Sequence, residues 1–263
     1  THICCGFPQM DAFFPVGKWS FTGNPVRQNI IDLVDRDNPA NQAAVRARFG
    51  LQPNLPVVFV TGGSLGARTI NEALFVGLVT LAKAGVQVIW QMGLPFAKTH
   101  GEAINQLIND HGDVFLQEGS PRIFHAPFIY DMDDAYLASD VVISRAGAIS
   151  ISEIAVVGRA AVLVPSPNVT DDHQTKNAMA LVKKSAAILI TDANASTTLI
   201  KTCIDLLNDE SQIKSLGNNI SQLAITDAAE KIATEVIKLI KQSAMNSVMV
   251  LPNFISNPMN LVL

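Results

Sequence analysis

The chain has few cysteines, no excess of positive charge and no long uncharged apolar run, and each absence excludes a class of protein. Its three cysteines, of which Cys4 and Cys5 are adjacent, lack metal-ligand spacing. We therefore expect neither a zinc site nor a disulfide framework, and a cytoplasmic protein. A net charge of −4 gives no basic face for nucleic acid. No apolar run reaches the length of a membrane span.

Several catalytic and cofactor-binding motifs are also missing. No Gly-x-Ser-x-Gly elbow, His-Glu-x-x-His helix or paired-cysteine cluster occurs. The glycine-rich segment at residues 62–67 is not followed by the Gly-Lys-Ser/Thr of a Walker loop. It also departs from the Gly-x-Gly-x-x-Gly dinucleotide pattern, which argues against an NAD-dependent oxidoreductase.

What the chain does have is a large apolar fraction, arranged as alternating strands and helices. Hydrophobic residues make up 48% of the 263 residues, which is typical of a globular protein with a substantial core. After an irregular start, apolar runs predict strands at 56–60, 86–91, 113–117, 127–129, 141–143, 161–164 and 187–190. Helices are predicted at 30–49, 68–84, 97–110, 132–138, directly after 147, at 171–184 and within 196–241. The alternation predicts an α/β fold with a doubly wound, Rossmann-like parallel sheet.

Two turns that follow predicted strands are suited to an anion. Residues 145–148 lie between an apolar strand and a helix, and so do the glycine-rich residues 62–67. Backbone N–H groups at such turns lack intrahelical partners, and the helix dipole adds partial positive charge. Ligands of open α/β sheets bind at the carboxyl ends of the strands. We therefore expect both turns to share one crevice for a phosphorylated, hydroxyl-rich ligand.

Polar groups near these turns fit such a ligand. Ser64 adds a hydroxyl donor to the glycine-rich turn. Glu153, one turn into the following helix, can accept hydrogen bonds from sugar hydroxyls. Gln174 can both donate to and accept from a sugar, and Ile129 can offer its backbone N–H and C=O to a planar base.

Other polar residues have a structural interpretation. Ser150 and Ser152 are common residue types at helix starts. Asp171 and Asp172 complement a helix dipole, and nothing in the sequence demonstrates the convergent ligands of a metal site, so we expect no metal. A lone histidine such as His125 is more often structural than catalytic.

Five segments resemble a known family in sequence, order and spacing. They are TGNPVR at 22–27, GGSLGA at 62–67, FIYDM at 128–132, SRAGAISISEIAVVG at 144–158 and VPSPNVTDDHQTKNA at 164–178. Together they resemble the carboxyl-terminal domain of the MurG family, bacterial N-acetylglucosaminyltransferases that convert lipid I to lipid II in peptidoglycan synthesis. The resemblance covers roughly residues 1–241.

The resemblance implies a GT-B fold, in which two Rossmann-like domains face each other across a cleft. It implies UDP-N-acetylglucosamine as the ligand of this chain and no cofactor. The proposed base and the loop for undecaprenyl-linked lipid I belong to the family's amino-terminal domain, so no catalytic residue is assigned here and we expect this chain to be inactive alone. We expect residues 1–29 to be a remnant of that domain with the interdomain linker, 30–241 to be the UDP-sugar-binding domain and 242–263 to be a disordered tail.

The resemblance also implies roles for individual residues. Arg27 and Ser64 are expected near the diphosphate, the Ile129 backbone at uracil, Glu153 at the ribose hydroxyls and Gln174 at the N-acetylglucosamine ring. The helix start is expected to surround the diphosphate and ribose through Ala148, Ile149, Ser150, Ile151 and Ser152. Two positions depart from the family pattern, which often has glutamine in place of His173 and of Leu65.

Location and activity follow from the same resemblance as expectations. The full enzyme would lie on the cytoplasmic face of the bacterial inner membrane, which it would contact mainly through its acceptor domain. Two alternatives stay open: an enzyme like UDP-N-acetylglucosamine 2-epimerase, and a non-catalytic nucleotide-sugar-binding module. Turnover of the nucleotide-sugar without a lipid acceptor would indicate the epimerase, and UDP binding without turnover would indicate the module.

Overall fold

The computed structural model describes residues 2–8 and 13–250. Contacts between Cα atoms divide the chain into two units. One unit is Val26–Ala224, and the other combines Thr1–Pro25 with Ile225–Leu263. The sequence places the ends of the sugar-binding domain at residues 30 and 241 instead, and the origin of residues 1–29 stays a prediction.

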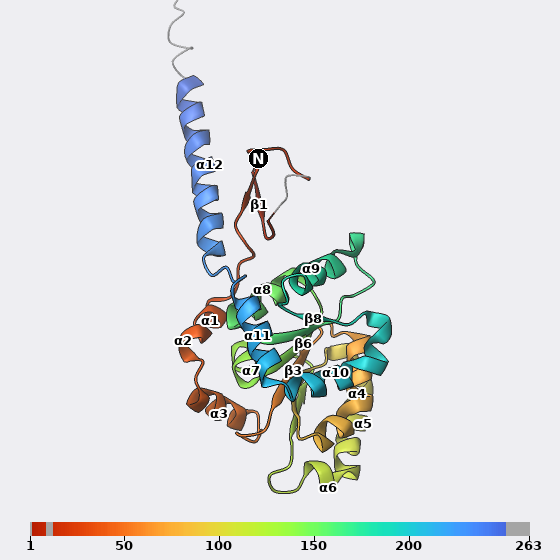
Figure 1. Ribbon diagram of the computed structural model, residues 1–263. Coiled ribbons are helices and arrows are strands. Elements are labelled where there is room, and N and C mark those ends of the chain that lie inside the picture. Colours follow the sequence, from red (N-terminus) through yellow and green to blue (C-terminus); the bar gives the residue numbers. More distant parts are fainter. Residues whose placement is uncertain (1, 9–12, 251–263) are drawn as a thin grey trace, which may run out of the picture. The chain divides into compact units, whose positions relative to one another are not determined.

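The larger unit contains a six-stranded sheet in the order β5-β4-β3-β6-β7-β8 (Figure 1). Its strands are β3 (Val57–Thr61), β4 (Gln87–Gln91), β5 (Ile123–Ala126), β6 (Val141–Ser144), β7 (Ala160–Leu163) and β8 (Ile188–Leu189). All neighbouring strands are parallel. The strand order reverses between β3 and β6, so the sheet is doubly wound and its switch point lies between these two strands.

Helices cover both faces of this sheet. They are α1 (Gln28–Ile31), α2 (Leu33–Arg36), α3 (Pro39–Arg48), α4 (Arg68–Lys83), α5 (Leu94–Asp110), α6 (Gly112–Phe115), α7 (Met132–Ala138), α8 (Ala148–Val157), α9 (His173–Val182), α10 (Ala195–Leu207) and α11 (Glu210–Ser221). Short 3-10 helices lie at Thr170–Asp172 and Asp192–Asn194. Figure 1 shows α4, α5 and α10 on one side of the sheet and α1, α2, α3 and α7 on the other.

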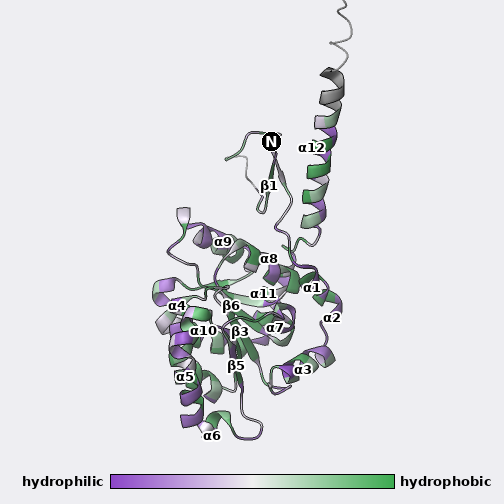
Figure 2. Cartoon of the chain, turned by 180° about the vertical axis from the view of Figure 1, so that it is seen from behind, coloured by the Kyte–Doolittle hydropathy of each residue, from purple (hydrophilic) through white to green (hydrophobic). Residues whose placement is uncertain are grey.

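The central strand β3 explains why the unit has two cores. All five of its residues are buried. Val57 and Phe59 pack into one core, whereas Val58 and Val60 pack into the core on the opposite face. Successive side chains of a strand point to opposite faces, so a strand covered on both sides is apolar at most positions, as the first four residues of β3 are. Figure 2 accordingly shows hydrophobic residues along the central strands.

Two predicted strands differ from the structure. The strand predicted at 113–117 is wrong, because residues 112–115 form helix α6, in which Val114 N–H donates to His111 O at 2.8 Å. A short apolar run does not distinguish a strand from a buried helical turn. The strand predicted at 127–129 is displaced, since β5 ends at Ala126 before Pro127, which has no N–H for the ladder.

The polar stretch at residues 30–49 does not form one helix, because it contains the end of α1, all of α2 and all of α3. The break before α3 follows from its capping sequence: Asn38 accepts a hydrogen bond from Asn41 N at 3.0 Å, and Pro39 occupies the first helical position. Proline is favoured there because its missing N–H would have no partner. The Asn-Pro pair in the sequence could have indicated this start.

The smaller unit contains two short strands and a long helix. Strands β1 (Ile3–Cys5) and β2 (Trp19–Phe21) pair in parallel within the segment predicted to be irregular. Helix α12 (Ala228–Val250) continues past residue 241, where the sequence predicts the tail to begin. Residues 251–263 of that tail lie outside the described residues. Within the described ranges, no helix combines the length and the apolar character needed to cross a membrane.

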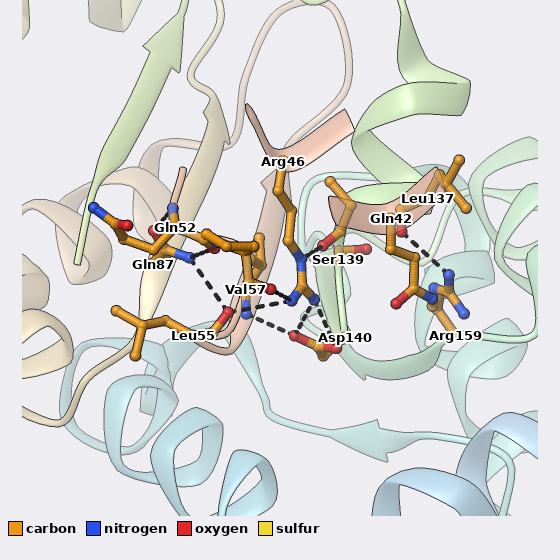
Figure 3. A network of polar contacts seen from close by, with 12 residues as sticks. Gln42, Arg46, Gln52, Leu55, Val57, Gln87, Leu137, Ser139, Asp140 and Arg159 are labelled. Atoms are coloured by element: carbon orange, nitrogen blue, oxygen red, sulfur yellow. Dashed lines mark hydrogen bonds and ion pairs between the residues drawn. The ribbon is translucent and has the colours of Figure 1, made fainter. Parts of the chain in front are cut away.

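A buried polar network holds the amino ends of the sheet strands (Figure 3). Arg46 of α3 donates to both carboxylate oxygens of Asp140 at 3.0 and 2.8 Å. It also donates to Ala138 O and Pro53 O, each at 2.9 Å. Asp140 precedes β6, and its Oδ2 accepts from the N–H of Val57, the first residue of β3, at 2.7 Å. The network therefore fixes the starts of the two central strands, at the edge opposite the predicted crevice.

Candidate functional site

The two predicted turns leave the sheet at adjacent points. Thr61 and Ser144 are the last residues of β3 and β6, and they are direct partners in the parallel ladder. The turns at 62–67 and 145–147 follow these residues and lead into α4 and α8. The structure therefore brings the two turns together at the switch point, as the sequence predicts.

An ion pair links the surroundings of both turns. Arg145 Nη1 donates to Asp192 Oδ1 at 2.5 Å and to the carbonyls of Val164 and Pro165 at 3.0 Å each. Asp192 Oδ2 accepts from Thr69 Oγ1 at 2.9 Å, in the first turn of α4. Arg145 thus connects the loop after β7 with the start of α4. Asp192 and Thr69 could not be predicted as partners of Arg145, because nothing local in the sequence pairs them with it.

The glycine-rich turn is closed against the loop after β4. Gly63 and Gly66 have φ values of +81° and +77°, in the left-handed region that favours glycine. A Cβ atom on Gly66 would lie 2.2 Å from Met92 O, so a larger residue would push the two loops apart. Ser64 lies exposed in this turn, and the neighbouring Leu65 is 80% exposed. The predicted donor Ser64 is therefore accessible to a ligand.

Helix α8 starts with backbone donors rather than with a side-chain cap. Its N-cap is Gly147, and within the described part of the chain no side chain caps it. The first intrahelical donor is Ile151 N, which bonds to Gly147 O at 2.9 Å. The amides of residues 148–150 precede it and have no intrahelical acceptor. Together with the helix dipole, these amides make the start of α8 suitable for an anion.

The side chains of the α8 start differ in accessibility. Ile149 is exposed, whereas Ile151 is buried in the core, so Ile151 can offer a ligand only its backbone. Ser152 Oγ donates to Ala148 O at 2.9 Å, within the helix. This hydrogen bond supports a structural role for Ser152 at the helix start. Its contact with a ligand stays a prediction.

Glu153 is a buried carboxylate with two kinds of partner. Its Oε1 accepts from Arg27 Nε and Nη2 at 3.2 and 2.9 Å, and its Oε2 accepts from the Tyr136 hydroxyl at 3.2 Å. The Arg27 side chain is 49% exposed and that of Glu153 is 7% exposed. Burial, and then the Glu153 charge, raise the pKa of Tyr136 well above its usual value, so the phenol stays protonated and donates. The structure thus brings Arg27 and Glu153 together and adds Tyr136.

Ile129 has a backbone N–H that is already engaged. It donates to Gln91 Oε1 at 2.9 Å. The Gln91 amide nitrogen in turn donates to Thr61 Oγ1 and Gly63 O, each at 3.2 Å. Buried Gln91 therefore ties the glycine-rich turn to Ile129. Base recognition by both backbone groups of Ile129 would require Gln91 to release the N–H, whereas recognition by the carbonyl would not.

Gln174 lies in the first turn of α9, close to the loop after β7. Its Oε1 accepts from Ser166 N at 2.9 Å, which leaves its NH2 group for a ligand. Asn177, one turn further along, donates to Ala146 O at 3.2 Å. This contact attaches α9 to the turn before α8, so Gln174 belongs to the same edge of the sheet as the two turns.

The remaining polar candidates have local partners. His173 Nδ1 lies 2.9 Å from Thr170 O, and Asp172 Oδ1 accepts from Thr175 Oγ1 at 2.6 Å. His125 Nε2 lies 3.0 Å from Asn105 Oδ1 on the neighbouring helix α5. In the part of the chain that the structure describes, no three His, Cys, Asp or Glu side chains are grouped to hold a metal ion.

A doubly wound parallel sheet with small-residue turns at its switch point is the architecture of Rossmann-like domains. The model of the glycosyltransferase family 28 C-terminal domain matches residues 57–232. The chain therefore belongs to glycosyltransferase family 28, and the predicted fold class, the carboxyl-terminal domain of a GT-B glycosyltransferase, is confirmed.

Individual relatives identify the family more narrowly than the family model does. The chain is 43% identical over 243 residues to the UDP-N-acetylglucosamine--N-acetylmuramyl-(pentapeptide) pyrophosphoryl-undecaprenol N-acetylglucosamine transferase of Bacteroides fragilis. This alignment covers 92% of this chain and 60% of that protein. The chain is also 42% identical over 238 residues to the protein of the same name from Cytophaga hutchinsonii, in an alignment that covers 90% of this chain and 59% of that protein.

A solved structure gives the same result. The crystal structure of Acinetobacter baumannii MurG matches with a TM-score of 0.65 and 26% identity, over 90% of this chain and 60% of that one. The resemblance to the MurG family is thus confirmed. The chain spans 59–60% of the length of the two curated relatives.

Proposed function

We propose that this chain binds UDP-N-acetylglucosamine as the donor-binding part of an inverting glycosyltransferase. That enzyme would transfer N-acetylglucosamine to undecaprenyl-linked lipid I and form lipid II in peptidoglycan synthesis, in support of cell-wall growth and division. The names of the relatives support the substrates. The observation that carries the proposal is the pair of anion-type turns at the switch point, with the buried Glu153 carboxylate one helical turn beyond.

The donor would extend along the carboxyl edge of the sheet. Its diphosphate would lie at the glycine-rich turn and the start of α8, within reach of Ser64. The ribose hydroxyls would bind Glu153, and the uracil would lie at the Ile129 backbone. The sugar would take hydrogen bonds from the NH2 group of Gln174, the part of that side chain not bonded to Ser166.

The reaction would be a direct displacement at the anomeric carbon. The 4-hydroxyl oxygen of the acceptor attacks that carbon and passes its proton to a base in the acceptor-binding part, and the bond to the diphosphate breaks. UDP leaves with increasing negative charge on its diphosphate. Backbone amides and the dipole at the start of α8 are already oriented to stabilise this charge, so the step does not require a metal from this chain.

The acceptor also determines where the whole enzyme would work. Undecaprenyl-linked lipid I lies in a membrane, so the enzyme would act as a peripheral protein on the cytoplasmic face of the inner membrane. The acceptor-binding part would supply most of that contact. The donor-binding chain would supply the nucleotide-sugar.

Calorimetric titration of the full chain tests donor binding. We expect one molecule of UDP or UDP-N-acetylglucosamine to bind per chain without added metal, and NADH not to bind. We expect no transfer to a lipid I analogue by this chain alone. Absence of UDP binding would contradict the proposal. Conversion of UDP-N-acetylglucosamine to its 2-epimer without an acceptor would support the epimerase instead.

Replacing Arg27 tests where the diphosphate lies. Arg27→Ala is expected to weaken UDP binding by about fivefold, because the diphosphate loses its contact with a guanidinium that is half exposed and therefore screened by solvent. It is expected to leave the binding of uridine unchanged or stronger, because the guanidinium then no longer occupies Glu153 Oε1. Competition calorimetry with both ligands measures the difference. Arg36→Ala is a matched control, since Arg36 is similarly exposed and paired with Asp133 and Asp134. Equal weakening of UDP and uridine by Arg27→Ala would reject this placement.

A further inference from the structure

We propose that Tyr136 is a positioning residue whose buried hydroxyl holds the Glu153 carboxylate in place for a ribose diol. Tyr136 would thereby set the preference of the site for ribonucleotides over 2′-deoxyribonucleotides. The inference rests on the proposed function, in which Glu153 is the group that binds the ribose hydroxyls.

The Glu153 carboxylate has few acceptor positions left for a ligand. An ionised carboxylate offers about four lone-pair sites, two on each oxygen. Two N–H groups of Arg27 point at Oε1, and the Tyr136 hydroxyl points at Oε2. One site on Oε2 therefore stays open beside the Tyr136 contact. A second ribose hydroxyl gains an acceptor only when Arg27 moves away from Oε1.

The two partners of Glu153 differ in their freedom to move. The Arg27 side chain is 49% exposed, so it can leave the carboxylate for a charged part of the ligand. Tyr136 is fully buried. Tyr136 is therefore the fixed partner and Arg27 is the exchangeable one.

The fold holds Tyr136 at both its ring and its backbone. The ring packs edge-on against Phe59 of the central strand β3, with ring centroids 5.3 Å apart and an interplanar angle of 87°. The Tyr136 carbonyl accepts from Ser139 Oγ at 2.9 Å and from Arg159 Nε at 3.2 Å. The centre of the sheet thus sets the position of the hydroxyl, and the hydroxyl in turn sets the orientation of Glu153.

Loss of the hydroxyl has a predictable consequence. The buried Oε2 atom would have no fixed donor, and the carboxylate would turn toward Arg27. A ribose diol would then meet an acceptor that is not oriented in advance. We expect Tyr136→Phe to weaken UDP binding by about fivefold, the size of one typical net hydrogen bond. The effect on 2′-deoxy-UDP should be smaller, because this ligand brings only one of the two hydroxyls to Glu153.

The experiment compares calorimetric affinities of the full chain for UDP and 2′-deoxy-UDP. The wild-type chain is expected to prefer UDP by about tenfold, the size expected for one buried hydroxyl. Tyr136→Phe is expected to reduce this ratio severalfold. An unchanged ratio overturns the inference. Phe49→Leu is the control, because it loosens another edge-on ring contact at the same core, that of Phe49 with Phe124, and keeps both the Tyr136 hydroxyl and its ring contact with Phe59. It should lower the temperature of unfolding and leave the ratio as it is, and an equal fall of the ratio would assign the effect to packing and overturn the inference.

A double-mutant cycle with Glu153→Gln shows whether Tyr136 acts through Glu153. In the Glu153→Gln chain, adding Tyr136→Phe should change neither affinity further, and an additive loss would overturn the inference. The wild-type chain distinguishes a failure of the proposed function from a failure of this inference. If the wild-type chain does not bind UDP, the proposed function and the inference about Tyr136 are both rejected. If it binds UDP but does not prefer it to 2′-deoxy-UDP, then Glu153 does not bind the ribose hydroxyls, and the inference about Tyr136 is rejected.

Discussion

Glu153→Ala is expected to weaken the binding of UDP-N-acetylglucosamine to this chain by about tenfold or more, as measured by calorimetry. Without the carboxylate, the ribose hydroxyls are buried with no acceptor, which costs roughly 1–3 kcal/mol. The variant also removes the acceptor for Arg27 and for the buried hydroxyl of Tyr136. An unchanged affinity would contradict the assignment of Glu153 to the ribose.

The same variant can also destabilise the fold, so its effect on affinity needs a matched control. Asp134 of α7 is a buried carboxylate as well, with a side chain that is 6% exposed and paired with Arg36 and Arg48. Asp134→Ala removes a buried, arginine-paired acid that is not bonded to Arg27 or Glu153. We expect it to lower stability and to leave donor affinity unchanged. A similar loss of affinity in both variants would indicate a general effect of stability.

The sheet was predictable because buried parallel strands have continuous apolar sequences. Strands β3 and β6 are apolar up to their last residues, Thr61 and Ser144, and small-residue turns follow at once, so their positions could be predicted from local sequence. The strand at the sheet edge was less predictable. β5 is only partly buried, and its end is determined by pairing with β4 and by Pro127 rather than by its own composition.

The candidate site was predictable only where each residue carries its own signal. Glu153 lies one turn after a phosphate-type turn, and this position alone suggested its role. Its partners had no such signal, because Arg27 is 126 residues away in sequence and meets Glu153 only in the fold. Tyr136 carried a weaker signal. A tyrosine within an apolar helix needs a hydrogen-bond partner when it is buried, although the sequence does not say which.

The largest effect on stability is expected at the amino ends of the sheet strands, opposite the candidate site. Arg46→Met should lower the free energy of unfolding by about 3 kcal/mol, because it breaks a largely buried ion pair and leaves its partner uncompensated. The side chains of Arg46 and Asp140 are 9% and 33% exposed. The carbonyls of Ala138 and Pro53 lose their donor in the same variant. Urea unfolding followed by circular dichroism measures the change.

The control for this variant is Arg48→Met on the same helix. Arg48 is 61% exposed, and its partner Asp134 keeps a second ion pair with Arg36, so we expect a loss of only about 0.5–1 kcal/mol. Equal losses in the two variants would show that burial of the Arg46 pair is not the cause. Because Arg46 holds the amino ends of β3 and β6 and the turns lie at their carboxyl ends, Arg46→Met should leave the UDP affinity of the folded chain unchanged. Residues at the amino ends of the strands would then determine stability, and residues at the carboxyl ends would determine donor binding.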